Sequence, residues 1–250
     1  MKESMNEMLH RFLTKKNELE KKAEYPRLYQ SRTIEKKIFA EGFGFYKLFW
    51  IFVIGSIIGA IVEIIFCGLV YDVIMSRSSL VFGQFSVVWG LGGVFLTYTL
   101  HWFIDKSDRF ILVAGTILGG LFEYMCSVFT EKVFGCVFWD YSNIPFNING
   151  RVNLLYCFFW GIASLIWIKI CYPWMSHLIE KLPMIYGRIL TWLFILFFFF
   201  NISITFAALY QMKTRNDDVE PKTWAGRYVE THFSDEWLNE RYLNLIQTEE

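Results

Sequence analysis

Five long apolar segments alternate with short polar stretches along the middle of the chain. Each segment is long enough, as a helix rising about 1.5 Å per residue, to cross about 30 Å of hydrocarbon. The segments are expected at residues 46–71, 82–103, 110–134, 152–173 and 187–210. This pattern predicts an all-α fold, a polytopic bundle of about five transmembrane helices that spans a lipid bilayer between residues 45 and 210.

The head, residues 1–44, is charged and has apolar residues at helical spacing. We expect a helical segment on the cytoplasmic side. Two interpretations stay open for it, namely a solvated or interfacial amphipathic helix and an arm that binds a partner.

The tail, residues 211–250, is acidic, with five Lys and Arg against nine Asp and Glu. Ser234, followed by Asp235 and Glu236, is typical of a helix start, because a serine side chain caps free amides and acidic residues favour the positive end of the helix dipole. We therefore expect an amphipathic helix that lies on the membrane or on the bundle.

Lys and Arg beside the segments predict the orientation, because positive residues are enriched in cytoplasmic loops. The head and the two shorter turns carry this excess, for example at Lys106, Arg109, Lys181 and Arg188. The N-terminus is therefore expected in the cytoplasm of a multi-pass protein of the cytoplasmic membrane. Five crossings would place the tail outside, whereas Lys213 and Arg215, directly after the last segment, favour the opposite side.

Composition excludes several other classes of protein. The chain has 24 Lys and Arg against 24 Asp and Glu, so no basic surface for nucleic acid is indicated. Its five cysteines form no CxxC pair, which gives no sign of a disulfide framework or a zinc site. We expect no metal and no cofactor.

The first and third segments share a pattern in which two glycines and a glutamate recur at every fourth position. The two stretches are Gly55-x3-Gly59-x3-Glu63 and Gly115-x3-Gly119-x3-Glu123. Residues four apart lie on one helix face, so each helix offers a glycine stripe for close packing that ends at a carboxylate facing protein. The segments that follow both contain Trp-Gly, which predicts two copies of one hairpin with a site between them; coincidence among glycine-rich helices is the alternative.

A carboxylate in a low-dielectric environment needs a partner or a proton. Glu63 and Glu123 are therefore expected to meet Arg77 and Arg151, which lie in the outer loops. Further oxygens for this polar cluster would come from Glu131, Asp140, Asn147 and Asn149. Two interpretations stay open, namely ion pairs that dock the loops onto the bundle and a pocket that binds a substrate or cation or relays protons.

The same region resembles a bacterial family of integral membrane proteins, the "putative ABC-transporter type IV permeases". The family pattern is a membrane glutamate, then Asn-Arg-Gly…Gly-Pro…Ile-Tyr-Gly, then Glu-Tyr, Trp-Trp-Asp-Tyr-Ser and Phe-Asn-x-x-Gly-Arg. The matching positions here are Glu63, Arg77, Gly83, Trp89-Gly90, Glu123-Tyr124, Glu131, Trp139-Asp140-Tyr141-Ser142, Phe146-Asn147, Gly150-Arg151 and Trp160-Gly161. Ser78 and Gln84 depart from the pattern, where the family has glycine and proline.

The resemblance and the buried charges predict a permease-like transport component of unknown substrate. Because the chain contains no GxxxxGK[ST] phosphate loop, an ATPase would be a separate subunit. A second copy of the chain is another partner compatible with the sequence. The alternatives are a non-transporting scaffold or sensor and, least favoured, an intramembrane acid–base enzyme, since none of the four histidines lies near the cluster.

Overall fold

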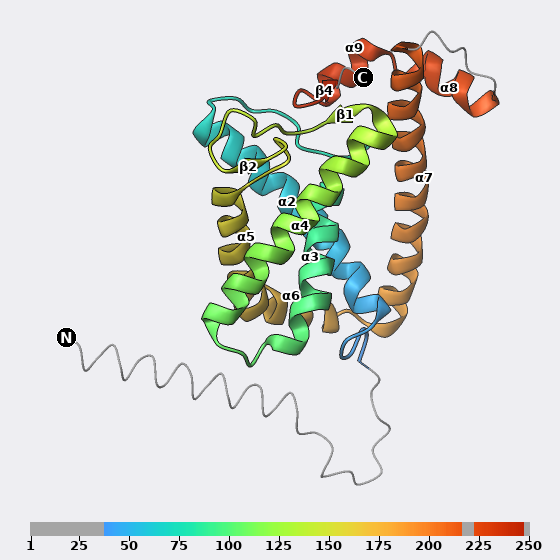
Figure 1. Cartoon of the computed structure of the whole chain (residues 1–250). Helices are drawn as coiled ribbons and strands as arrows, with labels where there is room; N and C mark the ends of the chain where they lie inside the picture. The colour runs from blue at the N-terminus through green and yellow to red at the C-terminus, as the bar shows by residue number, and fades with distance from the viewer. Residues whose placement is uncertain (1–37, 217–222, 248–250) are drawn as a thin grey trace, which may run out of the picture. The chain divides into compact units, whose positions relative to one another are not determined.

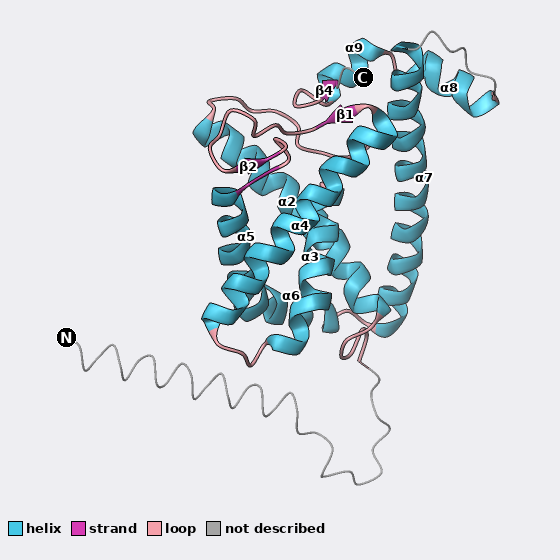
Figure 2. Ribbon diagram, viewed as in Figure 1, coloured by secondary structure: helices cyan, strands magenta, loops and turns pink. Residues whose placement is uncertain are grey.

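The computed structural model describes residues 38–216 and 223–247, and the predicted helical head falls almost entirely outside them. Its longer elements are α2 (Phe45–Val70), α3 (Val87–Leu100), α4 (Asp108–Phe134), α5 (Leu154–Ile166), α6 (Tyr172–Glu180), α7 (Met184–Asn216), α8 (Trp224–His232) and α9 (Asp235–Arg241). A 3-10 turn, His101–Phe103, follows α3, and a π-helical turn, Trp167–Cys171, joins α5 to α6. Figure 2 shows how strongly helix dominates.

Four two-residue strands form two small antiparallel pairs. They are β1 (Cys136–Val137), β2 (Asn147–Ile148), β3 (Val152–Asn153) and β4 (Ile246–Gln247). β2 pairs with β3 inside one loop, so that Asn147 lies opposite Asn153. β1 pairs with β4, which joins the end of α4 to the C-terminal tail.

Within residues 38–216 and 223–247, four helices are long and apolar enough to cross a membrane: α2, α4, the continuous helix Leu154–Glu180 and α7. The predicted all-α membrane bundle is therefore confirmed. The second segment differs from the expected residues 82–103, because its helix is shorter and begins at Val87 rather than at residue 82. Residues 72–86 form a loop instead, with Gly83 at φ +77°, in the left-handed region that glycine adopts readily.

The helix ends follow local chemistry. The Ser107 side chain accepts a hydrogen bond from the amide of Phe110 and so caps α4, and Gly135 ends that helix in a left-handed conformation. Asn153 caps α5 in the same way as Ser107 caps α4. The π turn lies just before Pro173, whose missing amide removes one helical hydrogen bond from Lys169 and favours this distortion.

The two predicted hairpins pack through equivalent positions. A Cβ atom added to Gly90 would lie 2.7 Å from the carbonyl oxygen of Phe52, and one added to Gly161 would lie 2.6 Å from that of Leu112. The stripe glycines match as well, because a Cβ on Gly59 would overlap Trp89 and one on Gly119 would overlap Trp160. Each pair of helices thus meets backbone to backbone, which only glycine allows at these positions.

The two remaining stripe glycines behave alike too. A Cβ on Gly55 would lie 3.5 Å from the Cα of Gly90, and one on Gly115 would lie 3.3 Å from the Cα of Gly161. These equivalent contacts support a duplicated hairpin, α2–α3 followed by α4–α5. The glycine stripes predicted from the sequence are the surfaces along which each hairpin closes.

The end of the bundle that carries the short turns, residues 104–107 and 181–183, is called the turn end here. An apolar core at this end joins α2, α3, α4 and α6, with Ile51, Leu100 and Ile168 fully buried. Lys47 in the first turn of α2 is also fully buried, and its ammonium group pairs with Glu180 and donates to the Ser176 hydroxyl at 2.5 Å. This contact ties the start of α2 to α6.

The opposite end, called the loop end, carries residues 71–86, residues 135–153 and the C-terminal tail (Figure 1). Arg241 of α9 donates to the carbonyl of Leu80 at 2.8 Å, and Asn244 donates to that of Phe138 at 3.1 Å. The predicted cap is present, since the Ser234 hydroxyl accepts from the amide of Trp237. The apolar side of this helix lies on the bundle, where Leu238 is buried.

Arg215, which directly follows the fifth segment, is bound by residues of the C-terminal tail. Its guanidinium donates to Asp235, to Glu230 and to the carbonyl of Phe233. An arginine neutralised by its own tail is not a free positive charge beside a helix end. The tail lies at the same end of the bundle as the two loops (Figure 1).

A candidate polar site at the loop end

Arg77 lies against Glu63 near the end of α2, with 3.3 Å between Nε and Oε2. The loop that brings it there is braced by the Ser78 hydroxyl, which accepts from the amides of Leu80 and Phe85. Asn201 of α7 also exchanges two hydrogen bonds with the backbone of Phe82. The pairing of Glu63 with Arg77 expected from the sequence is therefore present.

Glu123 does not pair with Arg151, and this expectation is wrong. The Glu123 side chain accepts hydrogen bonds from the Tyr141 hydroxyl at 2.8 Å and from Nε1 of Trp160 at 3.0 Å. Only 8% of Glu123 is exposed, and both of its oxygens are bonded to neutral donors. It lies where α4 and α5 meet, sealed on the loop side by a tyrosine.

Arg151 instead pairs with Glu131, eight residues further along α4. Eight helical residues correspond to about 12 Å along the helix axis. The β2–β3 pair and the turn at Gly150, with φ +67°, direct the Arg151 side chain to this more distant carboxylate. Its guanidinium also lies 5.8 Å from the ring centre of Tyr124.

The polar residues of the 135–153 loop mainly build the loop itself. Asp140 accepts from the side chain and the backbone amide of Ser142, and these two hydrogen bonds hold the pKa of the exposed Asp140 carboxyl below its usual range. Asn147 donates to the carbonyl of Ile144 and accepts from the amide of Gly150. The expectation that Asp140 and Asn147 add oxygens to the cluster is therefore not met.

Asn149 lies nearer to the cluster but does not reach a carboxylate. Its side-chain amide donates to the hydroxyl of Tyr124 at 3.3 Å, and its main-chain carbonyl accepts from the Arg151 guanidinium. It therefore supports the side chains around Glu131.

Sequence reasoning missed the direct partners of Glu123. Tyr141 and Trp160 both belong to motifs that the sequence singled out, but neither was assigned to the glutamate. The signal in the sequence is that Trp160 immediately precedes Gly161. The contact of Gly161 with α4 places the Trp160 indole where the two helices meet. Tyr141 in turn stacks on Tyr156, with ring centres 4.7 Å apart.

The cluster is unbalanced in charge. It holds three carboxylates, those of Glu63, Glu123 and Glu131, and two guanidiniums, those of Arg77 and Arg151. Ser127 lies between Glu123 and Glu131 on the same helix face, and its hydroxyl is buried without a hydrogen-bond partner. Among the described residues no group of three His, Cys, Asp or Glu side chains is arranged to hold a metal ion.

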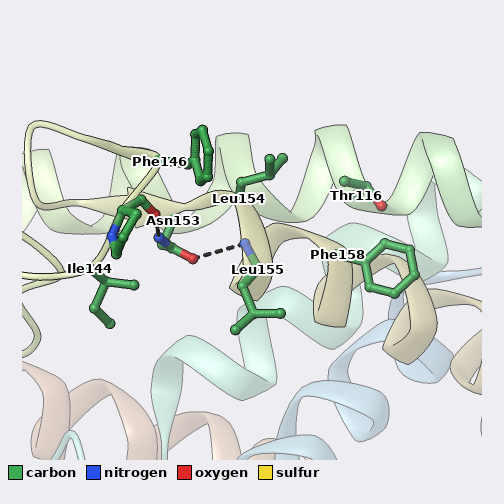
Figure 3. A pocket seen from close by; sticks show the side chains of 8 residues that line it. Thr116, Ile144, Phe146, Asn153, Leu154, Leu155 and Phe158 are labelled. Atoms are coloured by element: carbon green, nitrogen blue, oxygen red, sulfur yellow. Dashed lines mark hydrogen bonds between the residues drawn. The ribbon is translucent and has the colours of Figure 1, made fainter.

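A separate groove of about 580 Å³ lies on the outer surface of α4 and α5 (Figure 3). Its lining is apolar apart from Thr116 and Asn153, and Asn153 is engaged in capping α5. Phe146 and Leu154 in its wall are widely exposed, as expected for side chains that face lipid. The groove does not include the carboxylate cluster.

The sequence model of a protein family described as "Putative ABC-transporter type IV" matches residues 50–206. The chain belongs to this family. The matched range runs from α2 into α7 and includes both hairpins and all three carboxylates, whereas α8 and α9 lie beyond it. No curated protein and no solved structure matches the chain.

The family and the apolar helices together make this a membrane-embedded, transport-associated protein. The resemblance predicted from the motifs around Glu123 and Arg151 is thereby confirmed. The family match assigns no substrate and gives no role to individual residues.

Proposed function

We propose that the chain is a permease-like transport component of the cytoplasmic membrane and that Glu123 lies on its transport pathway. The observation that carries this proposal is the burial of the Glu123 carboxylate where α4 and α5 meet, with Tyr141 and Trp160, both neutral, as the partners that the described residues provide. A charged side chain at the centre of a membrane helix costs about 2.5–3.5 kcal/mol, and such residues commonly mark substrate or ion pathways. Its partner Trp160 packs against Trp89 of the other hairpin, and sites near the junction of internal repeats are a recurring feature of transporters.

Tyr141 is the element that would open and close this site. Its hydroxyl occupies one oxygen of Glu123, and it belongs to the 135–153 loop rather than to a membrane helix. Movement of that loop would free the carboxylate toward the loop end. The Arg77–Glu63 and Arg151–Glu131 pairs would meanwhile keep both loops attached to the bundle.

The distribution of cations supports a cytoplasmic turn end. Lys106, Arg109, Lys181 and Arg188 are exposed there. Four arginines of the loop end, Arg77, Arg151, Arg215 and Arg241, are engaged in ion pairs or hydrogen bonds, whereas Lys132 and Arg227 are exposed there. Since free positive charge favours the cytoplasmic side, the loops and the tail would lie outside, and a separate ATPase subunit would bind at the turn end.

A non-transporting scaffold is the second candidate, and the same two ion pairs favour it. Arg77 and Arg151 are each held by a carboxylate of the bundle. A bundle whose loop end stays permanently closed would need the same two contacts. In that case Glu123 would serve only to anchor Tyr141.

Transport in the host separates the two candidates. Cells that lack the gene would be complemented with the wild-type chain, with Glu123→Gln or with Glu240→Gln, an exposed control in α9 outside the matched range. Mass spectrometry would then compare solute pools in cells and medium at equal amounts of membrane protein. We expect Glu123→Gln to reproduce the solute changes of the deletion and Glu240→Gln to behave as wild type. Full complementation by Glu123→Gln would overturn the proposal.

A further inference from the structure

Building on this transport role, we propose that the site at Glu123 binds an organic ammonium ion with free N–H groups. The Glu123 carboxylate would be its counter-ion, the Ser127 hydroxyl would accept one of its hydrogen bonds, and aromatic rings would surround its carbon atoms. Three independent features of the loop end support this assignment.

The first feature is charge. Arg77 and Arg151 each bind another carboxylate, so the partners of Glu123 among the described residues are the neutral Tyr141 and Trp160. When ionised, Glu123 therefore carries a negative charge that neither arginine compensates, in a largely desolvated place. Interaction with one positive charge is strongest where water is excluded, so a monovalent cation fits this imbalance.

The second feature is the group of aromatic side chains near Glu123. Trp160, which donates to Glu123, packs against Trp89 of the other hairpin with ring centres 6.0 Å apart. Phe122 lies edge-on to Trp160 at 6.2 Å, and Tyr141 stacks on Tyr156. Tryptophan and tyrosine faces attract organic cations, and this attraction strengthens in a desolvated site.

The third feature is the hydroxyl of Ser127. This side chain is 1% exposed, has no hydrogen-bond partner and lies one helical turn from Glu123 on the same face of α4. A buried polar group without a partner is destabilising, so this hydroxyl is available as an acceptor beside Glu123. An N–H donor beside the carboxylate would satisfy it.

A bare metal ion fits less well. Calcium requires six to eight oxygen ligands and magnesium a near-octahedral set, as a rule. Each Glu123 oxygen already accepts from a neutral side chain, and the described residues hold no group of three metal-ligating side chains. An ammonium ion needs only the carboxylate, one further acceptor and the rings. To admit it, the Tyr141 hydroxyl would leave the carboxylate and the ammonium N–H would take its place.

Binding is tested on the full chain purified in detergent, by the rise of its unfolding temperature with ethanolammonium, tetramethylammonium or sodium at equal ionic strength. A ligand that binds only the folded state raises this temperature with concentration. We expect ethanolammonium to stabilise the wild type and sodium to have no effect. In Glu123→Gln the apparent affinity should fall by at least about 30-fold, because the partner of a buried charge is removed.

Ser127→Ala provides a variant that should still fold, because the hydroxyl it removes has no partner. This variant should bind ethanolammonium severalfold more weakly than the wild type. Its affinity for tetramethylammonium, which has no N–H group, should be unchanged. Glu240→Gln should match the wild type with both ions.

Equal stabilisation by sodium, no stabilisation by ethanolammonium, or an undiminished response in Glu123→Gln would each overturn the assignment of an ammonium ion. Failure of the transport role looks different. In that case ethanolammonium would bind in a Glu123-dependent way, while the Glu123→Gln variant still complemented the deletion in cells.

Discussion

Gly161→Ala is expected to destabilise the bundle by about 1–3 kcal/mol, the range for forcing extra atoms into a packed interior. The new Cβ would lie 2.6 Å from the carbonyl oxygen of Leu112 and 2.2 Å from the Thr116 hydroxyl. The first contact is with backbone, which cannot rotate away, so α5 must move from α4. Unfolding temperature and the monodisperse fraction in detergent would both fall.

Gly68→Ala is the matched control, because the same substitution is made in another membrane helix. A Cβ there meets only the Ile74 side chain at 3.7 Å, an ordinary contact. Alanine is also the better helix former, by about 1 kcal/mol. The control should therefore be neutral or stabilising. Equal losses in the two variants would contradict the close packing of the hairpin.

Glu180→Ala is expected to have the largest effect on stability, with an upper bound of about 3–5 kcal/mol, the range for a fully buried ion pair, since 29% of the Glu180 side chain is exposed. Lys47 is fully buried and forms an ion pair with the Glu180 carboxylate, while Ser176 provides only neutral acceptors. The variant would leave an ammonium group inside the turn end without its counter-charge. Thermal unfolding of the purified protein measures the loss.

The double variant Lys47→Met with Glu180→Ala separates charge from packing. Methionine removes the buried charge while keeping most of the side-chain volume, so the double variant should be more stable than Glu180→Ala alone. Such non-additivity is expected for residues in direct contact. If the two changes simply added, the ion pair would not be the reason for the loss.

The sequence predicts the helices and their glycine stripes well, because both depend on local periodicity. Gly55, Gly59, Gly115 and Gly119 lie at the helix contacts where the four-residue spacing places them. The start of α3 at Val87 could not be read from hydropathy, since the preceding loop is itself apolar and is fixed by contacts with α7 and α9.

The sequence predicts which residues make up the candidate site, but not which of them pair with one another. A buried glutamate needs partners, but spacing alone cannot say whether they are charged or neutral. The turn at Gly150 and the β2–β3 pair decide that Arg151 reaches Glu131, and this is a property of the folded loop. Tyr141 and Trp160 became the partners of Glu123 because the loop and the Gly161 contact bring them to the same point on α4.

The cation-selective site proposed at Glu123 would lie beneath Tyr141 and open toward the loop end. It is tested most directly by placing a cysteine at the buried Ser127 position, Ser127→Cys, after replacing the five native cysteines with alanine. The rate of modification would be compared for a trimethylammonium and a sulfonate methanethiosulfonate reagent, with Tyr141 intact and with Tyr141→Ala.

We expect slow modification while Tyr141 is present and faster modification in Tyr141→Ala. The cationic reagent should then react at least about tenfold faster than the anionic one, because a cleft of one charge sign concentrates the opposite sign. Equal rates for the two reagents, or a rate that does not depend on Tyr141, would contradict the proposed site.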